Sequence, residues 1–157
     1  SCNAAISACE KGRHWFLALQ LLREMQRSGP GGDQITCSAV VSACEKACQW
    51  TKALGFLGDG HWRKMALSKM TFNAAVSACE KARQWERAED VLGAMQRGGF
   101  QPSVISFNAA ISADEKGQQW ERALGLLDVM NWGSSAPDSV TWSAAISACG
   151  GCAQWEA

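Results

Sequence analysis

Apolar residues recur along the chain in two alternating helical patterns. Residues 71–81 carry small apolar side chains at the spacing i, i+3, i+4, which places them on one helical face and lets a second helix approach closely. Residues 85–99 carry larger apolar side chains in one stripe, made of Trp85, Ala88, Val91, Leu92 and Met95. Apolar and polar residues show no convincing period-2 alternation with hairpin turns. The pattern therefore predicts an all-α protein.

These patterns repeat every 35 residues without insertion or deletion. Each block opens with a Ser or Thr and places a Trp at the start of its second helix, where we expect it to pack between helices: Trp15, Trp50, Trp85, Trp120 and Trp155. A single hairpin cannot bury its apolar face, whereas stacked hairpins can. We therefore expect one array over residues 1–157, an α-solenoid coiled as a right-handed superhelix. Its blocks are residues 1–35, 36–70, 71–105, 106–140 and the partial block 141–157.

The ends of the helices have their own sequence signals. The Ser or Thr that opens each block is a candidate N-cap, because its hydroxyl can accept an unpaired backbone N–H. Gly98 and Gly99 are candidates to end the second helix of the third block. In the second block, Gly55, Gly58 and Gly60 fall inside the second helix, and each interior glycine costs roughly 1 kcal/mol relative to alanine. That helix is expected to be short or frayed.

Composition excludes several classes of protein. Hydrophobic residues make up 47% and charged residues 19%, which is unlike a disordered chain. No apolar run reaches the about 18 residues of a membrane span, so no membrane partner is expected. Fifteen Lys and Arg balance fifteen Asp and Glu, so bulk charge does not indicate nucleic-acid binding. The chain does not begin with Met, and we expect it to be a piece of a longer array whose targeting segment lies elsewhere.

Catalytic and metal-binding chemistry has little support in the sequence. The two histidines, His14 and His61, occupy unlike positions of the repeat, and no nucleophile, phosphate-loop or zinc motif is present. We expect no enzyme activity, no cofactor and no metal. Four cysteines share one position on the small-residue face, where Asp114 stands in the fourth block, and are expected to be buried and unpaired: Cys9, Cys44, Cys79 and Cys149. A metal or redox role, from the spacings Cys149 to Cys152 or Cys44 to Cys48, is the minor alternative.

The blocks resemble the pentatricopeptide repeat. The shared pattern is an opening Ser or Thr, often followed by an aromatic residue and then Asn, with a Lys after the first helix and an Ala in the second. In the last block, Gly151 replaces the Lys. The third and fourth blocks, with the exits Gln101-Pro102-Ser103 and Ala136-Pro137-Asp138, carry the strongest resemblance. The tetratricopeptide repeat is the near relative, but its period is 34. Other residues replace the family's usual Tyr: Cys2, Cys37, Phe72, Phe107 and Trp142. Trp142 is expected to pack, whereas Trp62 and Trp132 are candidates for exposure.

The resemblance implies sequence-specific binding of single-stranded RNA, one base per repeat. Proteins of this kind mostly serve RNA processing, editing, stability or translation in the mitochondrion or chloroplast. Catalytic activity usually comes from appended domains. Further repeats of the parent chain and other proteins are additional candidate partners.

The resemblance also assigns roles by repeat position. The base-reading residues would be a polar residue of the first helix and the exit-turn residue of the same block: Asn3, Asp33, Ser38, Ser68, Asn73, Ser103, Asn108, Asp138 and Ser143. The base-stacking residues would be Ile35, Met70, Ile105 and Val140, and the phosphate-contacting residues Lys11, Lys46, Lys81 and Lys116. The residues alone also allow plainer roles, because polar groups at a first turn often act only as caps and lysines favour helix C-termini.

Pairing the reading residues gives an expected base order of 5′-U-N-C-U-3′. The pairs of the first and fourth blocks, Asn with Asp, suggest uracil, and that of the third, Asn73 with Ser103, suggests cytosine. Ser38 with Ser68 remains undecoded. The alternative function is a scaffold that binds a protein or peptide in its concave groove, which the zero net charge favours.

Overall fold

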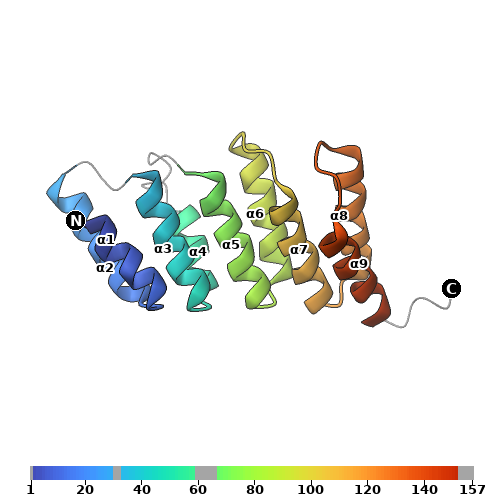
Figure 1. The fold of residues 1–157 in the computed structure, drawn as a ribbon, viewed down its shortest axis with the longest axis horizontal. Coiled ribbons are helices and arrows are strands. Elements are labelled where there is room, and N and C mark those ends of the chain that lie inside the picture. Colours follow the sequence, from blue (N-terminus) through green and yellow to red (C-terminus); the bar gives the residue numbers. More distant parts are fainter. Residues whose placement is uncertain (1, 30–32, 59–66, 152–157) are drawn as a thin grey trace. The chain divides into compact units, whose positions relative to one another are not determined.

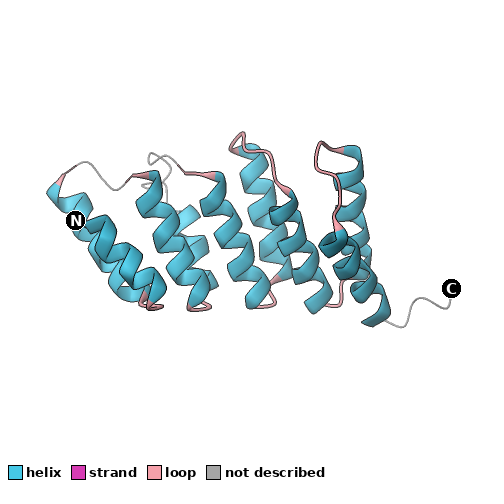
Figure 2. Ribbon diagram, viewed as in Figure 1, coloured by secondary structure: helices cyan, strands magenta, loops and turns pink. Residues whose placement is uncertain are grey.

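The computed structural model describes residues 2–29, 33–58 and 67–151. Over these residues the chain forms nine α-helices joined by turns and loops, as Figures 1 and 2 show. The helices are α1 (Cys2–Lys11), α2 (Trp15–Ser28), α3 (Gln34–Lys46), α4 (Trp50–Gly58), α5 (Lys69–Lys81), α6 (Trp85–Arg97), α7 (Val104–Lys116), α8 (Trp120–Trp132) and α9 (Ser139–Gly151). None of the helices in these ranges is long and apolar enough to cross a bilayer.

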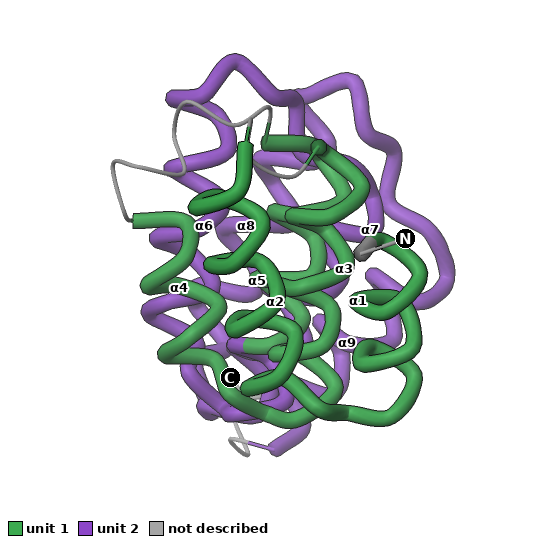
Figure 3. Tube along the Cα trace, turned by 90° about the vertical axis from the view of Figure 1, so that its left-hand side faces the viewer, with its two compact units in different colours: residues 1–78 green, residues 79–157 purple. Residues whose placement is uncertain are grey.

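The chain divides into two compact units, coloured separately in Figure 3, at residues 1–78 and 79–157. In the first unit, α1 packs against α2 and α3, and α3 packs against α2 and α4. In the second unit, α7 packs against α6, α8 and α9, and α8 also packs against α9. Each unit is therefore a stack of helical hairpins, the architecture of an all-α solenoid, as the repeat predicts.

Small residues form the contact surfaces between helices. Ala75, Ala78 and Cys79, the face predicted from the i, i+3, i+4 spacing, are fully buried. One alanine of each second helix is also fully buried at the same repeat position: Ala18, Ala53, Ala88 and Ala123. A methyl side chain at these positions allows two helices to approach without a cavity or a clash, which explains why the position keeps alanine.

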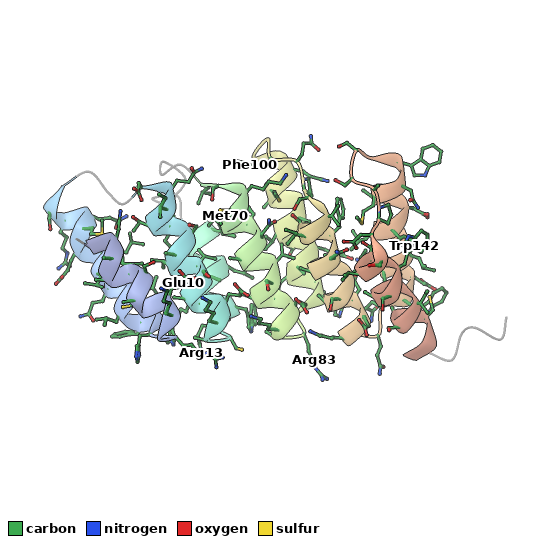
Figure 4. All side chains as sticks on the ribbon, viewed as in Figure 1. Glu10, Arg13, Met70, Arg83, Phe100 and Trp142 are labelled. Carbon is green, nitrogen blue, oxygen red and sulfur yellow. The ribbon has the colours of Figure 1, made fainter. Side chains whose placement is uncertain are left out.

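The turn within each hairpin uses one residue in the left-handed conformation. This residue has φ between 55° and 59° and is Arg13, Cys48, Arg83 or Gln118. Figure 4 shows Arg13 and Arg83 at the turns that follow α1 and α5. In the second hairpin, the Cys48 N–H donates to the Glu45 carbonyl (3.0 Å) and the Gln49 N–H to the Cys44 carbonyl (2.8 Å). These bonds satisfy carbonyls at the end of the first helix.

Several predicted helix ends are confirmed. Helix α6 ends at Arg97, with Gly98 as C-cap and Gly99 at φ 83°, and the Phe100 N–H donates to the Met95 carbonyl (3.0 Å). The described part of α4 runs from Trp50 to Gly58. The weakness expected around Gly58 to Gly60 stays a prediction, because Gly60 lies outside the described residues.

Some predictions of burial are wrong. Trp142 is 47% exposed rather than packed, and Cys149 is half-buried. The neighbouring Ile146 is 68% exposed, so this face of α9 is only partly covered among the described residues. The repeated tryptophans at positions 15, 50, 85 and 120 are half-buried. The Trp85 ring lies against Gly117, in the turn after α7. Trp132, a candidate for exposure, is 91% exposed, whereas Trp62, Cys152 and Trp155 lie outside the described residues.

Asp114 is a buried carboxylate at the position where other blocks carry cysteine. It is 0% exposed, and neither carboxylate oxygen has a hydrogen-bond partner among the described residues. Burial raises the pKa of Asp114 to about 7, with a further rise from Glu89 and an opposing effect of Arg122. The fourth block thus carries an unpaired acid in its core, which disfavours the folded state when the acid is ionised.

Candidate nucleic-acid interface

The exit-turn residues cap the helices that follow them. Asp33 is the N-cap of α3, and its Oδ1 accepts the backbone N–H of Thr36 (2.9 Å). Ser103 is the N-cap of α7 in a capping box with Ser106. The prediction that the opening Ser or Thr is the cap is therefore wrong by three residues. At α3, the Asp33 carboxylate accepts the orphan N–H, and Thr36, three positions later, is buried in the first turn.

In the first unit, the two predicted reading residues of the first block meet at one hydroxyl. The Thr36 Oγ1 lies 2.7 Å from the Asn3 Oδ1 and 2.7 Å from the Asp33 Oδ1. Asn3 comes from α1, while Asp33 precedes α3. Hydrogen bonds from Thr36, chiefly from its backbone N–H and secondly from its hydroxyl, hold the pKa of Asp33 below its usual range. The carboxylate is therefore ionised at neutral pH.

The second unit contains the same arrangement between α7 and α9. The Asn108 Nδ2 donates to the Asp138 Oδ1 (3.2 Å), and the Thr141 hydroxyl donates to the Asn108 Oδ1. The Thr141 backbone N–H donates to the Asp138 Oδ1 (2.9 Å), and its Oγ1 accepts the Asp138 N–H (3.1 Å). We call each of these sets an Asn–Asp–Thr cluster. Each unit thus brings its own predicted Asn and Asp together, at the same repeat position.

The remaining predicted reading residues are placed differently. The Ser38 hydroxyl donates to the Ile35 carbonyl (2.9 Å), while Ser68 pairs with Thr71 through their hydroxyl oxygens (3.0 Å). Asn73 is half-buried on α5, and Ser143 is exposed on α9. The serine pair of the second block therefore does not share the geometry of the two clusters.

Beside each exit turn stands an exposed aliphatic side chain. These four residues lie one position before the opening Ser or Thr of the next block. Their exposed fractions are 70% for Ile35, 71% for Met70, 68% for Ile105 and 59% for Val140. Figure 4 shows Met70 near the N-terminal end of α5. Scattered exposed apolar residues are common on proteins, but exposure at one repeat position in every described block provides a regular set of apolar contacts for flat ligands.

Two of the periodic lysines form ion pairs with glutamates of the preceding block. The Lys46 Nζ lies 2.8 Å from the Glu10 Oε1, and the Lys116 Nζ lies 2.7 Å from the Glu80 Oε1. Burial raises the pKa of Glu10, but hydrogen bonds from Lys46 and Ser42 outweigh it and hold that pKa below its usual range. Lys11 is exposed, and Lys81 has an interaction partner. The lysine row is thus partly neutralised before any ligand binds.

Two kinds of residue in this interface were not among the predicted site residues. The first is the opening threonine of the following block, which joins the predicted pair. The second is the glutamate that precedes each lysine: Glu10, Glu45, Glu80 and Glu115. Its strict period was visible in the sequence, but the pairing across blocks depends on helix packing.

The cysteines offer no metal centre within the described ranges. No group of three or more His, Cys, Asp or Glu residues there could hold a metal ion. Burial raises the pKa of Cys37, Cys44 and Cys79 to about 11, which keeps them as neutral thiols. Cys48 is exposed in the turn after α3, while Cys44 is buried, so these two residues face different environments despite their spacing.

Comparison with known proteins finds the pentatricopeptide repeat in both sequence and fold. A family model described as a pentatricopeptide repeat domain matches residues 62–115, and a PPR repeat model matches residues 1–30. No curated protein sequence matches significantly. The solved structure of the pentatricopeptide repeat protein PPR10 from maize is 28% identical with a TM-score of 0.75, and the match covers 98% of this chain and 22% of PPR10.

Two structures with bound RNA are also similar. PPR10 in complex with an 18-nt psaJ RNA element is 26% identical with a TM-score of 0.72, over 95% of this chain and 22% of that one. The PPR domain of Arabidopsis thaliana protein-only RNase P 1, in complex with tRNA, has a TM-score of 0.80 at 18% identity, over 99% and 84% of the two chains. This last likeness shows the fold alone. Because the family's repeat models match separate stretches of the sequence and the fold is shared over almost all of it, the chain belongs to the pentatricopeptide repeat family.

Proposed function

We propose that the chain binds single-stranded RNA and that each block recognises one base. The observation that carries the proposal is the Asn–Asp–Thr cluster, which occurs in both units at the same repeat position. A repeated polar cluster on an otherwise constant scaffold suits a ligand made of repeated units that differ in their hydrogen-bonding edges. The RNA complex of PPR10, a member of the same family, supports the same class of ligand.

The chemistry of the cluster favours a pyrimidine. Uracil carries an N3–H donor between two carbonyl acceptors, and an amide N–H beside an ionised carboxylate is complementary to that edge. Cytosine has an acceptor at N3, so a hydroxyl that can donate, as at Ser103, fits it better. On this basis the pairs Asn3 with Asp33 and Asn108 with Asp138 recognise uracil, and Asn73 with Ser103 recognises cytosine.

The exposed aliphatic residues supply the second part of the interface. A base that contacts Ile35, Met70, Ile105 or Val140 removes apolar surface from water on both partners. This contact is tolerant of base identity, because every base has an apolar face. Affinity would then come from stacking and phosphate contacts, while the polar clusters supply selectivity.

The proposal is tested by exchanging one reading residue. Ser103→Asp should shift the preference at the third base from cytosine to uracil and leave the first and fourth positions unchanged. The measurement is the ratio of dissociation constants for oligonucleotides that contain 5′-U-N-C-U-3′ or 5′-U-N-U-U-3′. An unchanged ratio, in a variant that still binds RNA, contradicts the assignment of Asn73 and Ser103 to one base.

We further propose that the parent protein acts in RNA processing in a mitochondrion or chloroplast, the usual setting of the family, and that this array contributes binding rather than catalysis. The test is twofold. Antibodies raised against this chain should detect the parent protein in an organelle fraction, and purified chain should leave bound RNA intact. Detection in the cytosol alone contradicts the location, and RNA cleavage by the purified chain contradicts the non-catalytic role.

A protein-binding scaffold is the second candidate, and one observation favours it. The ion pairs Lys46–Glu10 and Lys116–Glu80 reduce the positive field that an RNA backbone would meet. Selection of bound sequences from a random RNA pool separates the two candidates. Enrichment of a pyrimidine motif supports RNA recognition, and the absence of any enriched motif favours a protein ligand.

A further inference from the structure

The hydroxyl at the centre of each Asn–Asp–Thr cluster comes from the block after the one whose base it would help to recognise. Thr36 opens the second block and contacts Asn3 of the first, while Thr141 opens the fifth and contacts Asn108 of the fourth. Thr36 is 1% exposed and Thr141 is 0% exposed. Neither hydroxyl is therefore available to touch a base directly, yet both contact residues that could.

A hydroxyl has a single hydrogen, so it cannot donate to two acceptors at full strength. The Thr141 Oγ1 accepts the Asp138 backbone N–H (3.1 Å), which fixes one lone pair and turns the hydroxyl hydrogen towards the two side chains. With the Asn108 Oδ1 facing this hydroxyl and the Nδ2 facing the Asp138 Oδ1, both ends of the amide have a partner. One N–H of the Asn108 amide is left to donate outward.

The orientation of the amide decides what a base would meet. If the amide turned over, its oxygen would replace that outward N–H, and a donor would become an acceptor. We propose that the buried hydroxyls of Thr36 and Thr141 are positioning groups that hold the asparagine of the preceding block with its N–H towards the RNA. The unit that recognises a base then spans two blocks and is incomplete without the first turn of the next block. This inference rests on the proposed RNA recognition.

A purely structural role for the same hydroxyl must be separated from this one. Each threonine also contacts the residue that caps its own helix, and losing that contact destabilises the helix start. The second block provides a matched control. Thr71 is fully buried and contacts Ser68 (3.0 Å), but Ser38 donates to the Ile35 carbonyl instead. Thr71→Val therefore removes a comparable capping contact without removing a contact to a first-helix asparagine.

The experiment compares Thr141→Val, Thr141→Ser and Thr71→Val in the whole chain. For each we would measure the ratio of dissociation constants for RNA with uracil or cytosine at the fourth base. Thr141→Val should reduce this ratio by about three- to tenfold, the effect of losing one net hydrogen bond. Thr141→Ser should restore it, because serine keeps the hydroxyl and Ser106 occupies the same repeat position. Thr71→Val should leave the ratio at the fourth base unchanged. It should lower the melting temperature about as much as Thr141→Val does.

A second measurement needs no RNA. In protein labelled with ¹⁵N at asparagine side chains, the Asn108 amide hydrogen that is bonded to Asp138 should exchange slowly with water in wild type and faster in Thr141→Val. A wild-type fourth-base ratio after Thr141→Val, or an equal loss after Thr71→Val, overturns the inference. If wild type has no base preference, the proposed function fails by itself, and the amide exchange alone decides whether Thr141 holds Asn108.

Discussion

Lys116 of α7 and Glu80 of α5 form an ion pair across neighbouring blocks, with 2.7 Å between the Lys116 Nζ and the Glu80 Oε1. The Ser112 hydroxyl donates to the same carboxylate oxygen (3.1 Å). Glu10 on α1 (Figure 4) has the same two kinds of partner, Ser42 and Lys46. Each glutamate therefore binds the first helix of the next block and at the same time forms an ion pair with the lysine of that helix.

Removing this acid should strengthen RNA binding. In Glu80→Gln, Lys116 loses its competing carboxylate and becomes available to a phosphate, so affinity should rise for all RNA sequences alike. The dependence of log K on log salt should steepen by about 0.7, the value for one phosphate contact on a single strand. Glu86→Gln, which removes an exposed acid from the first turn of α6, is the control for net charge. Equal effects of the two variants contradict a specific role of Glu80.

The lysines themselves give the complementary prediction. Lys46→Gln and Lys116→Gln should each weaken binding to every RNA sequence by a similar factor and should make the salt dependence shallower, because phosphate contacts carry no base information. The measurement is a salt titration with two oligonucleotides that differ in one base. A change in base preference without a change in affinity would show that these lysines contact bases instead.

Asp114 should make the stability of the protein depend on pH. Its pKa is about 7 in the folded chain against an ordinary value of 3.8, so the folded state binds the proton more tightly than the unfolded state. The free energy of unfolding should therefore fall as pH rises from about 4 to 7, by up to about 4 kcal/mol at roughly 1.4 kcal/mol per pKa unit.

Asp114→Cys, which restores the residue of the other blocks, should remove most of this pH dependence and raise stability at neutral pH. Asp128→Asn, at an exposed acid on α8, is the control and should leave the pH dependence as it is. Urea denaturation at pH 4.5, 6 and 7.5 measures the effect. Parallel pH profiles for wild type and Asp114→Cys would rule out an ionisable Asp114 as the cause.

Gly117 should tolerate no side chain, because Trp85 lies against it. A Cβ on Gly117 would be 2.3 Å from the Trp85 Cδ1, and the Arg122 guanidinium stands 4.7 Å from the centroid of the same ring. Gly117→Ala should cost about 1–3 kcal/mol by overpacking. Gly125→Ala, at a helix position with nothing within 4 Å, should stabilise by up to about 1 kcal/mol. Thermal denaturation of both variants provides the comparison, and a neutral Gly117→Ala contradicts the packing argument.

Cysteine reactivity should follow burial rather than repeat position. Cys48 is exposed, whereas Cys37, Cys44 and Cys79 are buried and have pKa values near 11. Iodoacetamide at pH 8 should label Cys48 in the folded protein and the other three only after unfolding, because the thiolate is the reactive form. A time course read by peptide mass spectrometry measures each site, and Cys48→Ser is the control. Equal labelling rates for Cys44 and Cys48 would contradict the fold at this hairpin.

The fold was predictable because every block repeats the same local signals. Gly98 and Gly99 ended α6 as expected, and Ala88 was buried where the 35-residue step placed it. The helix start was not predictable from the same pattern. Asp33 and Thr36 are both competent caps, and only the backbone path shows that Asp33 accepts the Thr36 N–H while Thr36 is buried.

The candidate site was predictable by position but not by contact. Family resemblance indicated Asn3 and Asp33 as a pair, although no sequence signal showed that Thr36 joins them. The Glu80–Lys116 pair was hidden for a related reason. Glu80 is adjacent to Lys81 in sequence, but side chains one residue apart on a helix point in different directions, so the partner comes from the next block.

The capping role of the exit-turn residue has a consequence for the evolution and engineering of such arrays. Asp33 and Ser103 start the next helix, and only a few residue types, chiefly Asp, Asn, Ser and Thr, start helices well. A substitution chosen to change the recognised base must therefore come from this same small set, or the following hairpin loses stability. The set of bases that the exit-turn residue can recognise is therefore limited by helix initiation as well as by hydrogen bonding to RNA.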